Sequence, residues 1–242
     1  MVLMKPAPLP MALTLRVLAH LLSYPDATLR AHLPELHTAL HDERALTFGR
    51  LAEIDALIDR LACRTQGHRG LDVEAEYVEL FDRGRGTALH LFEHVHGDSR
   101  DRGPAMVDLV KTYEAAGLYL APGELPDHLT VVLQYASTQP PEQAKALLGE
   151  FAHILQVVFS ALLKRQSPYA SLLAALLDLA GEKAQAVPVP PEPEVDESWE
   201  EPLAFGGCST QGQGRPDQPQ TIQIVRRQAP GVATPASSGA ST

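Results

Sequence analysis

The stretch "PPEQAKALLGEFAHILQVVFSALLK", residues 140–164, decides the fold class of this chain. Its apolar residues recur every three or four positions, which places them on one face of an α-helix. Proline is favoured where a helix begins, and two prolines stand at the start of the run. The stretch therefore predicts a long helix with one face in a core. The residues on that face are Leu147, Leu148, Phe151, Ile154, Leu155, Val158 and Leu162.

Helical spacing extends through most of the first 186 residues. Leu15, Leu18, Leu21 and Leu22 share a face of a helix that Tyr24-Pro25 ends, since a residue before proline disfavours the α conformation. Asp26 is suited to cap the next helix, which runs toward His32, and Pro34 is suited to start another turn or two. Further helices are expected over residues 46–63, 71–81, 88–96, 104–117, 126–136 and 168–181. No alternating strand pattern interrupts them, so the fold class is all-α, a single globular multi-helix domain of about eight to ten helices.

The last 56 residues differ from the rest in composition. They contain nine of the 20 prolines, one Trp and one Phe, with almost no periodic apolar pattern. Such a segment cannot bury enough apolar surface to offset its loss of entropy on ordering. The predicted organisation is an all-helical domain over residues 1–186 and a Pro/Gly-rich, acidic and largely disordered tail over residues 187–242.

Charge and cysteine content exclude several functions. The net charge is −10, with 23 acidic and 17 basic residues before residue 187 and 7 and 3 after it. An acidic chain is a poor partner for nucleic acid, which is held through phosphate contacts. The two cysteines, Cys63 and Cys208, are too few for a disulfide framework or a cysteine-rich metal site. No run of 18 uninterrupted apolar residues predicts a membrane span, and we expect a cytoplasmic protein with no membrane insertion.

The segment "LHLFEHVHGDSRDRG", residues 89–103, carries the densest chemistry. His90, Glu93 and His94 spell H-x-x-E-H, the inverted signature of zinc peptidases. On one helix the two imidazoles could reach a single zinc ion, with Glu93 beside a bound water. Gly97 ends the expected helix three residues after His94, however, and histidines there can also satisfy the carbonyls of a helix end. A zinc metallopeptidase is therefore kept as an alternative function.

A longer string through the same residues carries a family resemblance. The string "YVELFDRGRGTALHLFEHVHGDSRDRGPAMVDLVKTYEAAGLYLAPGELPDHLTVVLQYAS", residues 77–137, resembles the respiratory nitrate reductase delta chain family. "LLSYPD" at residues 21–26 and "WEEPLAFGG" at residues 199–207 resemble further parts of that family. The one departure is Thr130-Val131, where relatives commonly have a step containing proline.

The resemblance implies an all-helical cytoplasmic chaperone that is not an enzyme and has no zinc site. Its expected partner is the catalytic (alpha) subunit of respiratory nitrate reductase, which it holds competent for molybdenum cofactor insertion before membrane docking. No cofactor is bound permanently, and no catalytic or metal-binding residue is expected. A chaperone of another molybdenum oxidoreductase is a second alternative, which the wording "HGDSRDRG" disfavours.

Candidate client-binding residues lie in and beside the polar loop. A helical scaffold can present an apolar groove to an amphipathic peptide. Arg100 and Arg102 suit a carboxylate or phosphate, although Asp98 and Asp101 could instead pair with them inside the loop. The charge of His94 and His96 is expected to change client affinity, and Asp127 and His128 are expected at the cap and first turn of the following helix. The full candidate set is Leu91, Phe92, His94, His96, Asp98, Ser99, Arg100, Arg102, Met106, Tyr113 and Glu124.

Overall fold

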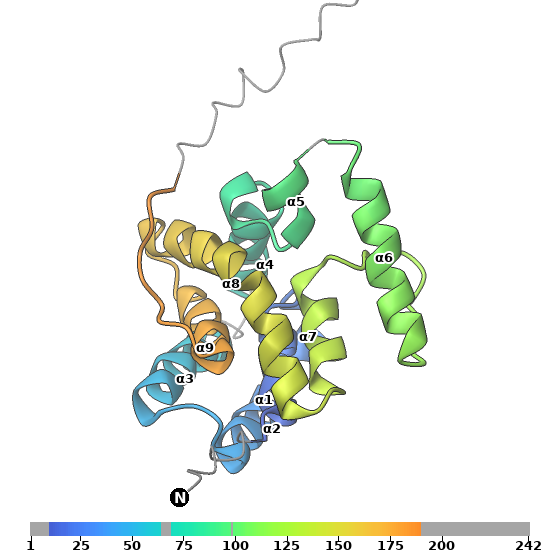
Figure 1. Cartoon of the computed structure of the whole chain (residues 1–242). Coiled ribbons are helices and arrows are strands. Elements are labelled where there is room, and N and C mark those ends of the chain that lie inside the picture. Colours follow the sequence, from blue (N-terminus) through green and yellow to red (C-terminus); the bar gives the residue numbers. More distant parts are fainter. Residues whose placement is uncertain (1–9, 64–68, 98, 190–242) are drawn as a thin grey trace, which may run out of the picture. The chain divides into compact units, whose positions relative to one another are not determined.

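Nine α-helices and one short 3₁₀ helix follow one another in a computed structural model, which describes residues 10–63, 69–97 and 99–189 (Figure 1). They are α1 (Ala12–Leu21), α2 (Ala27–Glu43), α3 (Phe48–Cys63), α4 (Arg69–Phe81), η1 (Arg85–Thr87), α5 (Leu91–His96), α6 (Arg102–Ala115), α7 (Leu129–Ser137), α8 (Pro141–Lys164) and α9 (Ala170–Ala180). Within these residues the only β pairing is an isolated antiparallel bridge between His90 and His128. The predicted all-α class is confirmed. The expected disorder of the tail falls largely on residues 190–242, which lie outside the described residues.

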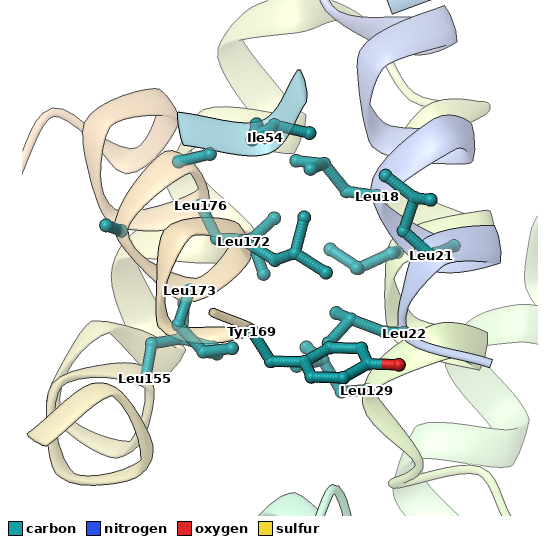
Figure 2. Close-up of a cluster of buried hydrophobic side chains, with 14 of the residues drawn as sticks. Leu18, Leu21, Leu22, Ile54, Leu129, Leu155, Tyr169, Leu172, Leu173 and Leu176 are labelled. Atoms are coloured by element: carbon teal, nitrogen blue, oxygen red, sulfur yellow. The ribbon is translucent and has the colours of Figure 1, made fainter. Parts of the chain in front are cut away.

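The core forms where α1, α8 and α9 face one another. Figure 2 shows Leu18, Leu21 and Leu22 of α1 facing α9, whose Leu172, Leu173 and Leu176 belong to the same cluster. All six of these leucines are fully buried. Because α8 packs along α9 and α1 packs along both α2 and α7, this core reaches most of the helices.

Helix α8 is the expected long helix, and it spans 24 residues. It is the one helix of the described residues that is long and apolar enough to cross a membrane, by length and composition alone. Its buried side chains, among them Leu148, Leu155 and Leu162, face protein neighbours instead. A helix in the core of a protein can be as long and as apolar as a membrane-spanning helix.

Helix boundaries follow local signals at several points. The Asp26 carboxylate accepts a hydrogen bond from the Leu29 N–H at 2.7 Å, so it caps α2 as predicted. Gly117 (φ 76°) follows α6 in the left-handed conformation, and the Leu118 N–H donates back to the Tyr113 carbonyl at 3.0 Å. Gly181 (φ 87°) ends α9 in the same conformation.

Pro34 does not start a new helix, contrary to the prediction. It lies inside α2, which runs unbroken for 17 residues. A proline there removes one backbone hydrogen bond. Contacts of α2 with α1 and α3 keep the helix continuous across it. Tertiary packing has therefore overridden the local preference.

The predicted helices at residues 88–96 and 126–136 both begin later than expected. α5 starts at Leu91 and α7 at Leu129, because the segments before them pair with each other. The Leu91 N–H donates to the Asp127 carbonyl at 3.0 Å, and the Leu129 N–H donates to the Leu89 carbonyl at 2.8 Å. This pairing holds His90 (φ −84°, ψ 101°) in an extended conformation.

The segment after α9 continues along α8. The Val187 N–H donates to the Ser160 hydroxyl at 2.9 Å, and the Gln156 side-chain amide donates to the Gln185 carbonyl. Ala184 packs against the core. The boundary expected between residues 186 and 187 falls inside this segment and remains a prediction.

Candidate functional site

Asp127 is the buried carboxylate around which the loop segments are arranged. Its side chain is fully buried, and its Oδ2 accepts a hydrogen bond from the Phe92 N–H at 3.2 Å. The Arg102 guanidinium donates to the same oxygen at 3.4 Å. His90 Nδ1 lies 3.6 Å from the other oxygen, beyond the distance of a hydrogen bond. Asp127 therefore joins the starts of α5 and α6 to the segment before α7.

These partners decide the ionisation of Asp127. Burial alone would raise the pKa of the carboxyl, but contact with His90, the Arg102 charge and the Phe92 amide hold this pKa below its ordinary value. The carboxylate is therefore the form that the folded protein stabilises. The sequence predicted Asp127 as the cap of the helix that follows it, yet His128 takes that position and Asp127 caps α5 across the loop.

The rings of His90 and His128 meet edge to face beside this carboxylate, with centroids 4.9 Å apart. His128 Nδ1 lies 2.6 Å from the Thr130 hydroxyl. Burial and the neighbouring charge of His90 lower the pKa of His128. A neutral His128 therefore belongs to the folded structure.

The same geometry removes the zinc-peptidase interpretation of H-x-x-E-H. His90 precedes α5 in extended backbone, so it and His94 are not a pair one turn apart on a helix. His94 Nε2 lies 2.8 Å from the Ala88 carbonyl, whereas the His90 ring faces Asp127. Within the described residues, the His, Cys, Asp and Glu side chains that converge as metal ligands do not include this motif. The two histidines have separate structural contacts.

The polar loop after α5 is mostly exposed. Gly97 (φ 50°) turns the chain, and the Ser99 hydroxyl donates to Asp101 at 3.3 Å while accepting from the Asp101 N–H at 3.2 Å. Arg100 is exposed. The carboxylate that pairs with Arg102 is Asp127, not Asp101. Asp98 lies outside the described residues.

A hollow of about 500 Å³ opens between α1, α7 and the segment that follows α6. Aromatic rings form much of its wall, and Tyr113 and Tyr135 pack with centroids 4.9 Å apart. The Tyr113 hydroxyl donates to the Pro126 carbonyl at 2.8 Å, and Arg16 Nε donates to the Ser137 hydroxyl at 3.2 Å. These contacts fix the Tyr113 side of the wall. The hollow is lined by Arg16, His20, Tyr113, Leu118, Tyr119, Leu120, Ala121, Glu124, Val131, Gln134, Tyr135, Ser137 and Thr138.

A shallower depression continues from the hollow along α6 and α7. Tyr135 borders both, and Lys111, Thr112 and Gln139 line the second. Tyr119, at the rim of the hollow, has 80% of its surface exposed, a large fraction for an aromatic side chain. The hollow lined by these tyrosines is named here the α1–α7 hollow.

The candidate residues from the sequence divide between two places. Tyr113 and Glu124 line the α1–α7 hollow. Leu91 is a core residue, and Phe92, His96 and Met106 are half-buried. The Phe92 ring lies 5.8 Å from that of His96 and 6.4 Å from that of Phe151. His94 lies in α5, Arg102 begins α6, and Ser99 and Arg100 lie in the loop between these helices. The structure therefore does not gather the described candidates into one pocket.

The prediction missed the α1 side of the hollow. Arg16 and His20 stand one turn apart on a helix whose other residues are largely buried. Polar residues at positions i and i+4 of an apolar helix were the available signal, because they mark a face that meets solvent. Gln134 and Tyr135 of α7 gave no comparable signal.

The fold and site define an all-helical protein in which a buried carboxylate joins the loop segments and an aromatic-lined hollow is open to solvent. Residues 23–175 match the family described as nitrate reductase delta subunit, and the chain belongs to that family.

Two relatives come from Escherichia coli strain K12. The nitrate reductase molybdenum cofactor assembly chaperone NarJ is 43% identical over 164 residues, which cover 68% of each chain. The probable assembly chaperone NarW is 53% identical over 111 residues, covering 46% of this chain and 48% of NarW. A probable NarJ of Bacillus subtilis strain 168 is 30% identical over 175 residues, covering 68% of this chain and 86% of the relative.

Proposed function

We propose that this protein is a cytoplasmic, non-catalytic assembly chaperone of a respiratory nitrate reductase. It binds the catalytic (alpha) subunit and holds it competent for molybdenum cofactor insertion before membrane docking, and it keeps no cofactor of its own. The observation that carries the proposal is family membership over residues 23–175, together with 43% identity to a nitrate reductase molybdenum cofactor assembly chaperone.

The α1–α7 hollow is the site that we assign to the client. Aromatic side chains provide large contact areas at low entropic cost and are typical of the central contacts in protein interfaces. Arg16 and His20 line the hollow together with Glu124, so charges of both signs surround the aromatic wall. Such a surface suits an amphipathic client helix with a few apolar anchors.

Binding to the purified catalytic subunit tests this assignment. Tyr119 is 80% exposed, so Tyr119→Ala removes a contact surface with little cost to the fold. We expect this change to weaken client binding about tenfold, the effect of losing one central aromatic contact. Phe48→Ala is the matched control, because Phe48 is 86% exposed and does not line the hollow. Equal affinities for Tyr119→Ala and wild type would reject the hollow as the client site.

The polar loop has a separate proposed role in cofactor loading. Arg100 is exposed, whereas Arg102 pairs with Asp127. Arg100→Ala should therefore change client contacts alone, and Arg102→Ala should also loosen the loop. If neither change lowers the molybdenum content of the client, the loop has no part in loading.

A further inference from the structure

Helices α2 and α3 bring three potential metal ligands together outside the α1–α7 hollow. His37 and His41 lie one turn apart on α2, and Asp55 faces them from α3. One nitrogen of each imidazole and one oxygen of the carboxylate all lie within 4.8 Å of one another. The two rings are neighbours, with centroids 4.5 Å apart.

The nitrogen–oxygen distances within this cluster are near those between ligand atoms around a metal ion. His37 Nε2 lies 3.4 Å and His41 Nε2 lies 3.0 Å from the same oxygen, Asp55 Oδ1. A tetrahedral zinc ion with bonds of about 2.1 Å holds its ligand atoms about 3.4 Å apart. Both nitrogen–oxygen pairs are therefore close to the edge length of such a tetrahedron, and small side-chain rotations would bring the second pair to it.

The donor set and its exposure indicate the kind of ion. Two imidazoles and one carboxylate suit Zn²⁺ and its first-row neighbours, and they do not suit Ca²⁺ or Mg²⁺, which prefer oxygen ligands. The side chains of His37, His41 and Asp55 are 46%, 38% and 28% exposed, so an ion has a path from solvent and room for a water ligand. The net charge of −10 also favours a cation.

We propose that His37, His41 and Asp55 form a binding site for one divalent transition-metal ion, with Zn²⁺ as the representative ligand. The ion bridges α2 and α3 and takes water at its remaining position. None of the three residues lines the α1–α7 hollow, so the site is separate from the proposed client site. Its ligands are also separate from the H-x-x-E-H motif.

Calorimetric titration of the metal-free full chain with ZnCl₂, under reducing conditions and without an affinity tag, tests the site. We expect saturable binding of one ion per chain. At about a hundredfold excess over Kd, the ion should raise Tm by about 5 °C. His41→Ala and Asp55→Asn should each weaken binding about tenfold or more, since loss even of an outer-shell partner of a metal ligand costs that much.

His32→Ala is the matched control, because His32 is an exposed histidine of the same helix and lies outside the cluster. It should leave zinc affinity unchanged. Titration with CoCl₂ adds a spectroscopic measure, in which wild type should give the visible absorption of a tetrahedral ion and Asp55→Asn should not. The proposal is overturned if zinc binding is not saturable, or if His41→Ala and Asp55→Asn bind zinc as wild type does.

Discussion

Asp127 is the residue on which the order of the polar loop depends most directly. Its oxygens meet the Phe92 N–H, the Arg102 guanidinium and the His90 ring, which come from three separate parts of the loop region. A buried carboxylate with such partners is costly to remove, because the partners stay behind without their acceptor. The sequence indicated that Asp127 caps a helix, but it could not show that the helix is α5.

Replacing Asp127 should therefore destabilise the fold, and by more with alanine than with asparagine. Asp127→Ala removes both the acceptor and the charge, and we expect a loss of about 2–3 kcal/mol in the free energy of unfolding, moderated because Arg102 is 27% exposed. Asp127→Asn keeps an acceptor for the Phe92 N–H and should cost about 1 kcal/mol. Urea unfolding measures both. A loss under about 0.5 kcal/mol for the alanine variant would contradict the assigned role.

His128 should make the protein less stable in mild acid. Burial and the charge of His90 lower its pKa in the folded state, so the unfolded chain takes up the proton at higher pH. The stabilising contribution of neutral His128 is present above the ordinary value of 6.5 and is lost as pH falls through the lower folded pKa. The lowered pKa of Asp127 adds a second loss, which begins only below its ordinary value of 3.8.

Urea unfolding from about pH 7.5 to about pH 5 isolates the His128 contribution, because Asp127 stays ionised there. We expect the free energy of unfolding to fall across this range in wild type and to fall less in His128→Asn. The asparagine has no proton to gain and can keep a hydrogen bond to Thr130. Equal slopes for the two proteins would exclude His128 as the source.

At the scale of the helices, two N-termini are capped from far along the chain. The Asp127 carboxylate caps α5, and the Glu43 carboxylate accepts from the Leu13 and Thr14 N–H groups of α1 at 3.0 and 2.6 Å. Neither cap stands next to its helix in sequence, so local capping rules could not find them. The late starts of α5 and α7 have a similar origin, since the pairing between their leading segments is a tertiary contact.

In helix α2, one substitution is expected to make the protein more stable. Pro34 is exposed in the interior of this helix, where it removes one backbone hydrogen bond. Pro34→Ala should raise the free energy of unfolding by about 1–2 kcal/mol, because the restored helical preference of about 3 kcal/mol exceeds the entropy that the unfolded chain regains. Thermal and urea unfolding measure the gain. Glu35→Ala, at an exposed neighbouring position, should change stability little, and a Pro34→Ala variant that is less stable than wild type would contradict this account.

For the whole molecule, periodicity was sufficient to predict the fold class. The apolar face of residues 147–162 and the leucines of α1 became the core that Figure 2 shows. Repeated helical spacing is a local property, and it survives in the folded chain wherever a buried face is required. The family resemblance, carried by residues 77–137, agrees with the match over residues 23–175.

The site was less predictable because it is assembled from distant segments. The α1–α7 hollow joins Arg16 and His20 to Tyr113, Glu124 and Tyr135. The proposed metal site joins α2 to α3, although the sequence directed attention to the histidines at 90 and 94. A motif within five residues shows which side chains are near in sequence, whereas the packing of helices decides which of them meet.

The molybdenum content of nitrate reductase tests the central claim most directly. The catalytic subunit is purified from a strain that lacks this protein, with and without a plasmid that restores it, and molybdenum per subunit is measured. We expect a subunit largely without molybdenum in the deletion strain, full loading with the wild-type plasmid, and reduced loading with Tyr119→Ala. A catalytic subunit that is fully loaded in the deletion strain would contradict the account.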